Sequence, residues 1–136
     1  MAYQFTQTAA QIQALLDYVE TLVPVVLFTG DATGDVTLSQ SAANYSKLKI
    51  YYDGYNGRSP QCLELTAPNG RTIDLSIVET NGGSQVRIRI ARYTISGTSI
   101  TLKTGENWNG NMLLTPSGNT WADGNVIHVT RVEGFI

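Results

Sequence analysis

The chain has 136 residues, the usual size of one domain, and it is long enough to bury a core without disulfides or metal. Its nine Lys and Arg against eleven Asp and Glu argue against a nucleic-acid binder. One Cys and one His exclude an internal disulfide framework, a Cys/His zinc site and a His-pair metal site, and we expect no cofactor.

The N-terminus does not read as a signal peptide. Met1 to Gln4 carry no positively charged side chain, and no apolar run of the required kind follows them. No stretch approaches the roughly 20 apolar residues of a membrane span. We therefore expect a soluble protein that is made in the cytoplasm and does not insert into membranes.

Residues 5–23 have the spacing of an amphipathic helix. Thr8 followed by Gln11 matches a capping box, and Pro24 predicts that the helix ends near Thr21 or Leu22. The apolar positions alternate in steps of four and three, which is the spacing of a coiled coil; they are Phe5, Ala9, Ile12, Leu16, Val19 and Val23.

The order of these steps assigns a heptad. Ala9, Leu16 and Val23 take position a, while Phe5, Ile12 and Val19 take position d. Leu at a with a β-branched residue at d favours three or four helices over two. Residues 1–23 are thus predicted to be a helical neck that joins chains through Ala9, Ile12, Leu16, Val19 and Val23. The alternative is a helix that folds back on its own domain.

After Pro24 the helical period gives way to short apolar segments separated by turn residues, about one every ten residues. Alternation in several of them predicts one buried and one solvated face per strand. The expected strands are 25–29, 36–39, 48–52, 62–66, 72–79, 85–95, 99–103, 112–115 and 126–132. Residues 24–136 are therefore predicted to form one antiparallel β-sandwich of jelly-roll kind.

Three turn signals, at Pro68-Asn69-Gly70, Asn81-Gly82-Gly83 and Ser96-Gly97-Thr98, predict a four-stranded meander from Cys62 to Lys103. The strands from both ends of the chain then complete the second layer. The inward-facing residues of the meander are predicted to be Leu63, Leu65, Ile73, Leu75, Ile77, Ile88, Ile90, Ile100 and Leu102.

No motif points to catalysis. His128 lies in a strand pattern without an acidic neighbour in sequence, so we interpret it as structural, and Cys62 likewise lacks a catalytic signature. The carboxylates show no spacing that selects an acid–base pair. Asp31 to Asp35 resemble a calcium loop only faintly, because the remaining ligands of such a loop are missing.

Loops that carry aromatic rings beside amides and carboxylates are the best candidates for binding. A ring can stack on a sugar face while amides and carboxylates hydrogen-bond its hydroxyl groups. The predicted ligand-binding residues are Tyr55, Arg58, Asn107, Trp108, Asn109, Trp121 and Asp123. The alternative is that Trp108 and Trp121 plug the open ends of the sandwich, because Trp is highly buried on average.

Four segments resemble small proteins of tailed phages and prophages of Gram-positive hosts. They are the opening FTQTAAQIQALLD from Phe5, LFTG with GDVTLS from Leu27 to Ser39, LKIYY from Leu48, and IHVTRVEGF from Ile127. The resemblance implies a homotrimer whose helices form a short neck below β-sandwich heads. It also implies a virion protein, assembled in the bacterial cytoplasm, that contacts other phage structural proteins.

The expected function is that of a non-enzymatic tail-fibre or receptor-binding head that recognises host cell-surface glycan. The alternative is a structural tail, baseplate or capsid-decoration protein without a glycan site. A glycan hydrolase is a third class, for which the sequence offers no carboxylate pair. The chain departs from the resembled pattern in having few residues before the helix, so a short N-terminus or a partner that grips the trimer would attach it to the virion, unless the chain is a truncated head.

Overall fold

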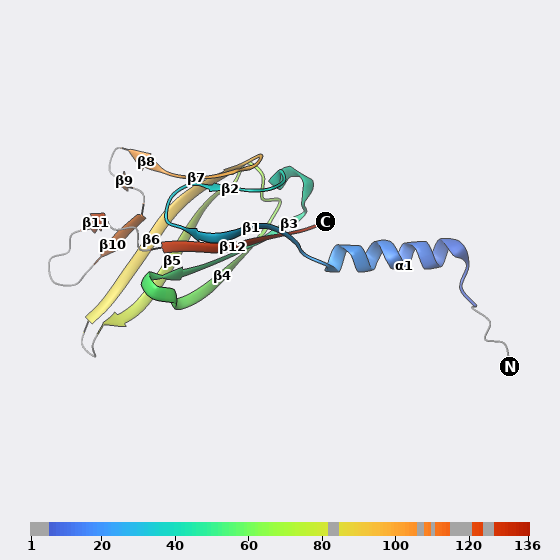
Figure 1. The fold of residues 1–136 in the computed structure, drawn as a ribbon, viewed down its shortest axis with the longest axis horizontal. Coiled ribbons are helices and arrows are strands. Elements are labelled where there is room, and N and C mark those ends of the chain that lie inside the picture. The colour runs from blue at the N-terminus through green and yellow to red at the C-terminus, as the bar shows by residue number, and fades with distance from the viewer. Residues whose placement is uncertain (1–5, 82–84, 106–107, 110, 115–120, 124–126) are drawn as a thin grey trace.

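The computed structural model describes residues 6–81, 85–105, 108–109, 111–114, 121–123 and 127–136. The chain folds into a β-sandwich from which one helix, α1 (Ala9–Leu22), projects (Figure 1). No helix in the described part of the chain is long and apolar enough to cross a membrane.

The predicted capping box at the start of α1 is confirmed. The Thr8 hydroxyl accepts a hydrogen bond from the Gln11 backbone N–H at 3.2 Å, and the Gln11 side chain accepts one from the Thr8 N–H at 2.8 Å. The helix ends at Leu22 with Val23 in an extended conformation, as expected immediately before a proline.

The helix does not fold back on its own domain, which contradicts that alternative. No residue from Ala9 to Leu22 is buried. The large side chains of the predicted a and d positions are 40–57% exposed, namely Ile12, Leu16, Val19 and Val23. Within a single chain, no described residue therefore buries the apolar stripe of α1.

The strands follow the predicted segments closely, with three further short ones. They are β1 (Val25–Ala32), β2 (Val36–Thr37), β3 (Lys47–Gly54), β4 (Arg58–Thr66), β5 (Thr72–Asn81), β6 (Gln85–Ser96), β7 (Ser99–Leu102), β8 (Thr104–Gly105), β9 (Trp108–Asn109), β10 (Asn111–Leu114), β11 (Trp121–Asp123) and β12 (Ile127–Phe135). Two short 3-10 turns, η1 (Ala42–Asn44) and η2 (Tyr55–Gly57), precede β3 and β4.

Two antiparallel sheets form the sandwich, as predicted. The first has the order β1-β12-β3-β4, so strands from both ends of the chain meet in it. In the second sheet β5 pairs with one edge of the long strand β6. The other edge of β6 is shared by β7, which continues to β2, and by β10, which continues to β11. A separate ribbon joins β8 to β9.

The core lies between the sheets and draws on both of them. Leu48 and Ile50 enter it from β3, and Leu75 and Ile77 enter it from β5, each at 2% exposure or less. Leu63, Leu65 and Leu102 pack against this cluster while partly exposed. The placements on β4, β5 and β7 confirm the inward faces predicted for those strands.

The prediction of a four-stranded meander is wrong at its first turn. Strand β4 pairs with β3 in the first sheet, whereas β5 pairs with β6 in the second. The chain crosses between the sheets at Ala67 and Pro68, where Ala67 has a φ of +45° and its N–H donates to the Ser46 carbonyl at 2.8 Å. Pro68 is buried and lacks an N–H, so it cannot donate a hydrogen bond to a neighbouring strand. This segment therefore connects the two sheets and does not continue either of them.

The predicted face of β6 is also wrong. Arg89, Ala91, Tyr93 and Ile95 point into the core, which turns Ile88 and Ile90 to the outer face. An inward arginine is tolerated because its guanidinium meets the Glu79 carboxylate, as described below. The apolar Ile88 and Ile90 lie instead on a partly solvated surface of the second sheet.

Candidate functional site

A row of three titratable side chains crosses the outer face of the first sheet, on neighbouring strands β1, β12 and β3. His128 on β12 stands opposite Asp53 on β3 in register. Asp31, near the end of β1, lies on the other side of His128, since its neighbour Ala32 pairs with Val129. The end of β1 and the start of β12 lie on the side of the sandwich that is remote from α1, here called the distal end (Figure 1).

The row borders a small polar pocket of about 260 Å³. Its lining consists of Asp31, Asp53, Asn56, Gly57, His128 and Thr130, which we call the distal pocket. Two carboxylates, an imidazole, an amide and a hydroxyl thus converge from two sheet strands, β12 and β3, from the end of β1 and from the turn η2. No Lys or Arg is among the lining residues.

His128 is the best-anchored member of the pocket. Its Nδ1 lies 2.5 Å from Asp31 Oδ1, and its side chain is 15% exposed. The Nε2 atom is buried and has no hydrogen-bond partner among the described residues. The carboxylate of Asp31 therefore fixes the imidazole orientation and favours a proton on Nδ1.

The environment of Asp53 disfavours its charged form. Burial raises the pKa of this carboxyl above its ordinary value, and the negative charge of Asp31 raises it further, while His128 acts in the opposite direction. A donor group from a ligand would relieve this unfavourable environment, because hydrogen bonds to a carboxylate stabilise its charge.

The turn η2 supplies Asn56 and Gly57 in left-handed conformations, with φ of +58° and +71°. Asn tolerates this region better than most residues, and Gly adopts it without steric cost. The turn closes one side of the pocket, and an added Cβ at Gly57 would stand 3.9 Å from Asp53 Oδ2.

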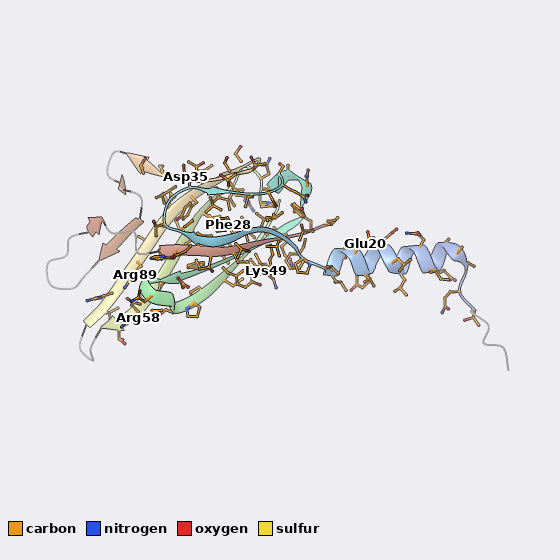
Figure 2. The ribbon with its side chains drawn as sticks, viewed as in Figure 1. Glu20, Phe28, Asp35, Lys49, Arg58 and Arg89 are labelled. Carbon is orange, nitrogen blue, oxygen red and sulfur yellow. The ribbon has the colours of Figure 1, made fainter. Side chains whose placement is uncertain are left out.

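A buried ion pair lies behind the turn. Arg89 Nε donates to Glu79 Oε1 at 2.8 Å, and its Nη2 contacts the same oxygen, with the two side chains 5% and 9% exposed. Gly54, which precedes η2, allows this approach: a Cβ there would lie 3.4 Å from Arg89 Nε and 3.3 Å from the Arg58 carbonyl. Figure 2 shows Arg58 and Arg89 together at the distal end.

The distal pocket is equipped to hold polar ligands by hydrogen bonds. Carboxylates and the Asn56 amide can accept and donate to hydroxyl or amine groups. The Thr130 hydroxyl donates to the Tyr51 carbonyl at 3.3 Å and is not aligned with His128 as a nucleophile would be. Across the described ranges, His, Cys, Asp and Glu side chains form no group of three that could hold a metal ion.

The predicted ligand-binding residues are placed unevenly. Arg58 begins β4, is exposed, and pairs with Gly54 beside η2, and the backbone of Tyr55 lies within that turn. The backbones of Trp108 and Asn109 form β9, and those of Trp121 and Asp123 belong to β11 on the second sheet. Their side chains, that of Tyr55 and the whole of Asn107 lie outside the described part of the structure.

The predicted ligand-binding set therefore contains none of the residues that line the pocket, although Tyr55 and Arg58 flank Asn56 and Gly57 in the sequence. From the sequence alone, His128 is interpreted as structural because no acidic residue is near it in sequence. The acidic partner, Asp31, is 97 residues away and meets it only through the pairing of β1 with β12. No local pattern could have revealed this contact.

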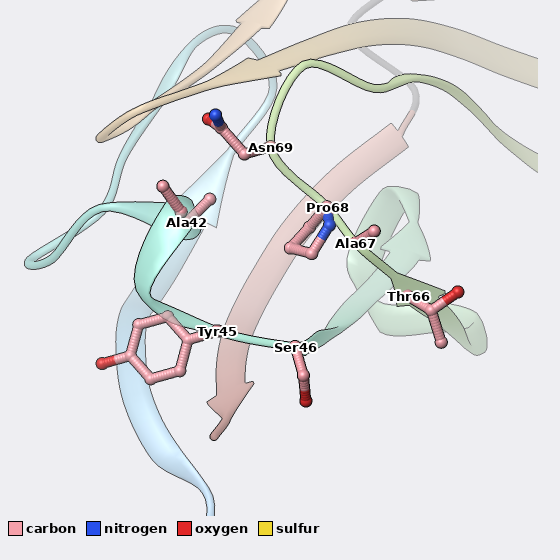
Figure 3. Close-up of a pocket in the computed structure, with 8 residues that line it drawn as sticks. Ala42, Tyr45, Ser46, Thr66, Ala67, Pro68 and Asn69 are labelled. Carbon is pink, nitrogen blue, oxygen red and sulfur yellow. The ribbon is translucent and has the colours of Figure 1, made fainter.

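A larger hollow of about 570 Å³ lies where η1 meets the crossing from β4 to β5 (Figure 3). Its lining is mostly small, with Ala42, Ala43, Ala67 and Pro68 prominent. The hydroxyl of Tyr45, which also lines it, donates to the Gln40 side chain at 2.7 Å. This hollow offers fewer converging polar groups than the distal pocket, which we take as the candidate site.

Comparisons with known proteins identify no family or relative from which a role for the site could be inferred. No protein-family model matches the chain, and no curated protein matches it significantly. The uncovered helix and the distal pocket are the two features on which a functional argument can rest.

Proposed function

We propose that the protein is a phage virion component, a homotrimeric tail-fibre or receptor-binding head that recognises host cell-surface glycan. In this proposal α1 is a coiled-coil neck, and the sandwich is a jelly-roll-like head. The trimer is assembled in the bacterial cytoplasm, joins other phage structural proteins, and presents three distal pockets away from the neck.

The uncovered helix is the observation that carries this proposal. A lone helix of 14 residues is marginal in water, and most of the stability of protein helices comes from packing an apolar face. Leu16 is 53% exposed and Val19 is 46% exposed, and packing from the rest of the described chain does not bury either side chain. Association with further copies is the direct way to bury this face.

The shape of the stripe favours more than two copies. Beside the a and d positions, Leu15 and Leu22 occupy position g and are 63% and 57% exposed. Together with Leu at a and Val at d, this widened apolar face suits a three-stranded coil better than a two-stranded one. The predicted trimer interface therefore includes Ala9, Ile12, Leu16, Val19 and Val23, flanked by these leucines.

Light scattering coupled to size-exclusion chromatography tests the assembly. The wild-type protein is expected to have three times the chain mass, and Leu16→Asp is expected to shift it to monomer, because it places three charges in one apolar seam. Ala14→Asp is the matched control: it adds the same charge at the outward f position and should remain trimeric. A monomeric wild-type protein refutes the trimer.

The glycan part of the proposal rests on the distal pocket. Its carboxylates, amide and imidazole match the hydrogen-bonding groups of sugars, and Arg58 follows the turn η2 that supplies Asn56 and Gly57. Its position remote from α1 leaves it open to a surface that the neck does not reach. A small, open pocket binds one sugar weakly, and a trimer multiplies weak sites when its geometry allows simultaneous contact.

The single histidine makes this site measurable without ambiguity, because every imidazole signal in an NMR spectrum belongs to His128. Titration with glucose, galactose and N-acetylglucosamine should shift this signal in a saturable way for at least one sugar. Asp53→Asn should weaken that response, whereas Glu64→Gln, which alters an exposed carboxylate on β4, should preserve it.

A glycan array with the intact trimer completes the test. Binding on the array together with the His128 shift supports recognition through the distal pocket. Binding that survives Asp53→Asn moves the site elsewhere on the head, with the predicted loops around Trp108 and Trp121 as the next candidates. A trimer that binds no glycan is the structural tail, baseplate or capsid-decoration protein of the alternative.

A further inference from the structure

An apolar pocket of about 300 Å³ lies where the helix meets the sandwich, at the opposite end from the distal pocket. It is lined by Val19, Glu20, Val23, Val25 and Ile136, and we call it the neck socket. The socket forms because β1 starts directly after the helix and pairs with the end of β12, which brings the last residue of the chain beside α1 (Figure 1).

The neck socket continues the apolar stripe of the helix into the head. Val19 and Val23 are the last d and a positions of the stripe, and Val25 and Ile136 extend it beyond Pro24. Val23 is 57% exposed and Ile136 is 61% exposed. Glu20, the only charged side chain among the described residues of the lining, lies on α1, as Figure 2 shows.

We propose that the neck socket receives Leu22 from a second copy of this chain, so that the neck and the heads are locked together. This inference rests on the proposed trimer and adds to it a specific contact. In parallel coiled coils, a residue at position g packs against position e in the next heptad of its neighbour. For Leu22 that position falls beyond the end of α1, at the level of β1, where the socket lies.

The character of the two surfaces supports this occupant. Leu22 is 57% exposed in its own chain and is the g residue nearest to the sandwich. Leu15, the other g residue, lies two turns further along the helix, beside Glu20 of a neighbour in the same register. A leucine side chain suits a socket whose walls are three valines and an isoleucine.

The contact has a structural consequence. A helix that leaves a domain through one extended residue and a proline would let the head swing about the neck. If each Leu22 is held between Val25 and Ile136 of the next copy, the three heads take one fixed orientation around the axis. The distal pockets then all face away from the neck together.

Cross-linking between two differently tagged chains tests the contact. Both chains carry Cys62→Ser, since Cys62 is exposed and would react. One chain carries Leu22→Cys, the other carries Ile136→Cys, and the co-expressed mixture is treated with a short thiol-reactive cross-linker. A product containing both tags is expected, and it is necessarily intermolecular because each chain holds a single thiol.

The control pair replaces Leu22→Cys by Ala14→Cys, which places the thiol at the outward f position two turns away and should give no mixed product. If light scattering shows the mixture to be trimeric but no Leu22–Ile136 product forms, the contact at the neck socket is refuted, whereas the proposed trimer is not. A monomeric wild-type protein overturns both.

A substitution at the C-terminal residue provides a second measurement. Ile136→Asp should raise the trimer dissociation constant about tenfold to a hundredfold for each of the three contacts, the effect of losing one buried apolar side chain at each, while Ile136→Leu should leave it nearly unchanged. Circular dichroism should show the same folded sandwich in both variants, since Ile136 is largely exposed in the single chain. Equal dissociation constants for Ile136→Asp and the wild type would contradict the proposal.

Discussion

Replacing Arg89 by Met should strongly destabilise the sandwich, although it exchanges a charged residue for an apolar one in a core. The Arg89 guanidinium and the Glu79 carboxylate are 5% and 9% exposed, and each is the charge partner of the other. Arg89→Met leaves Glu79 buried without its counter-ion, which costs about 3–5 kcal/mol of unfolding free energy in comparable buried pairs.

The double variant separates the cost of a broken pair from the cost of an altered core. Glu79→Leu alone should also be destabilising, because it leaves the Arg89 charge buried. Arg89→Met combined with Glu79→Leu removes both charges, and such replacements are often neutral or stabilising by about 1–4 kcal/mol. The coupling free energy in this double-mutant cycle should therefore be several kcal/mol, with the double variant near or above the wild type.

Urea unfolding followed by circular dichroism measures these differences. The matched control is Arg92→Met on the opposite face of β6, where Arg92 pairs with Asp74 at 2.6 Å but the side chains are 37% and 40% exposed. An exposed pair of this kind contributes little to the free energy of unfolding, because solvent and salt screen it. If Arg89→Met costs no more than Arg92→Met, then Arg89 does not point inward and the register of β6 given above is incorrect.

Three further predictions concern the core. Leu75→Ala should lower the unfolding free energy by about 2–5 kcal/mol in urea melts, since Leu75 is 1% exposed between the sheets. Gly134→Ala should cost about 1–3 kcal/mol in the same assay, because its Cβ would come within 2.5 Å of the Tyr45 ring; an unchanged midpoint would show that the ring moves aside freely. Burial raises the pKa of Tyr93 to about 12, so the contribution of Tyr93 to the free energy of unfolding should be nearly constant below about pH 9 and should fall by about 2 kcal/mol as the pH rises to 12. Tyr93→Phe should remove much of this alkaline loss and, because the buried hydroxyl has no partner among the described residues, add about 1 kcal/mol at neutral pH.

The sequence predicted correctly the features that depend on contacts between residues close to one another in the chain. Thr8, Gln11 and Pro24 set the two ends of α1 through contacts within a few residues, and the structure has those contacts. Most strands were found because alternation of polar and apolar residues has the period of the extended chain. The inward face of β5 followed in the same way from Ile73 to Ile77.

The alternation of side chains along β6 led to the wrong prediction of its inward face, because the residues on both faces of this strand could be buried. In β6, Ile88 and Ile90 alternate with Arg87 and Arg89, so burying the isoleucines was the natural interpretation. The outcome depends on Glu79, whose carboxylate neutralises Arg89 from the neighbouring strand. A charge pair between neighbouring strands cannot be predicted from the pattern of one strand alone.

The turn at Pro68 and the distal pocket were missed for a related reason. Pro-Asn-Gly signals a turn but does not say whether the next strand joins the same sheet or the opposite one. The pocket likewise depends on β1, β3 and β12 becoming neighbours, and these strands come from opposite ends of the chain. Such features follow from topology, which local patterns constrain only weakly.

The two ends of the molecule separate association from recognition. The residues proposed to join chains lie on α1 and at the neck socket, whereas the carboxylates of the distal pocket lie at the other end of the first sheet. Leu16→Asp should therefore leave the His128 response to a free sugar unchanged while it abolishes tight attachment to cells. That combination would assign the cellular affinity to three-fold avidity. A monomeric head that still attaches tightly would instead require one strong binding site. The distal pocket is not suited to be such a site, because it is polar, has a volume of only about 260 Å³, and leaves the Asp31 side chain 71% exposed.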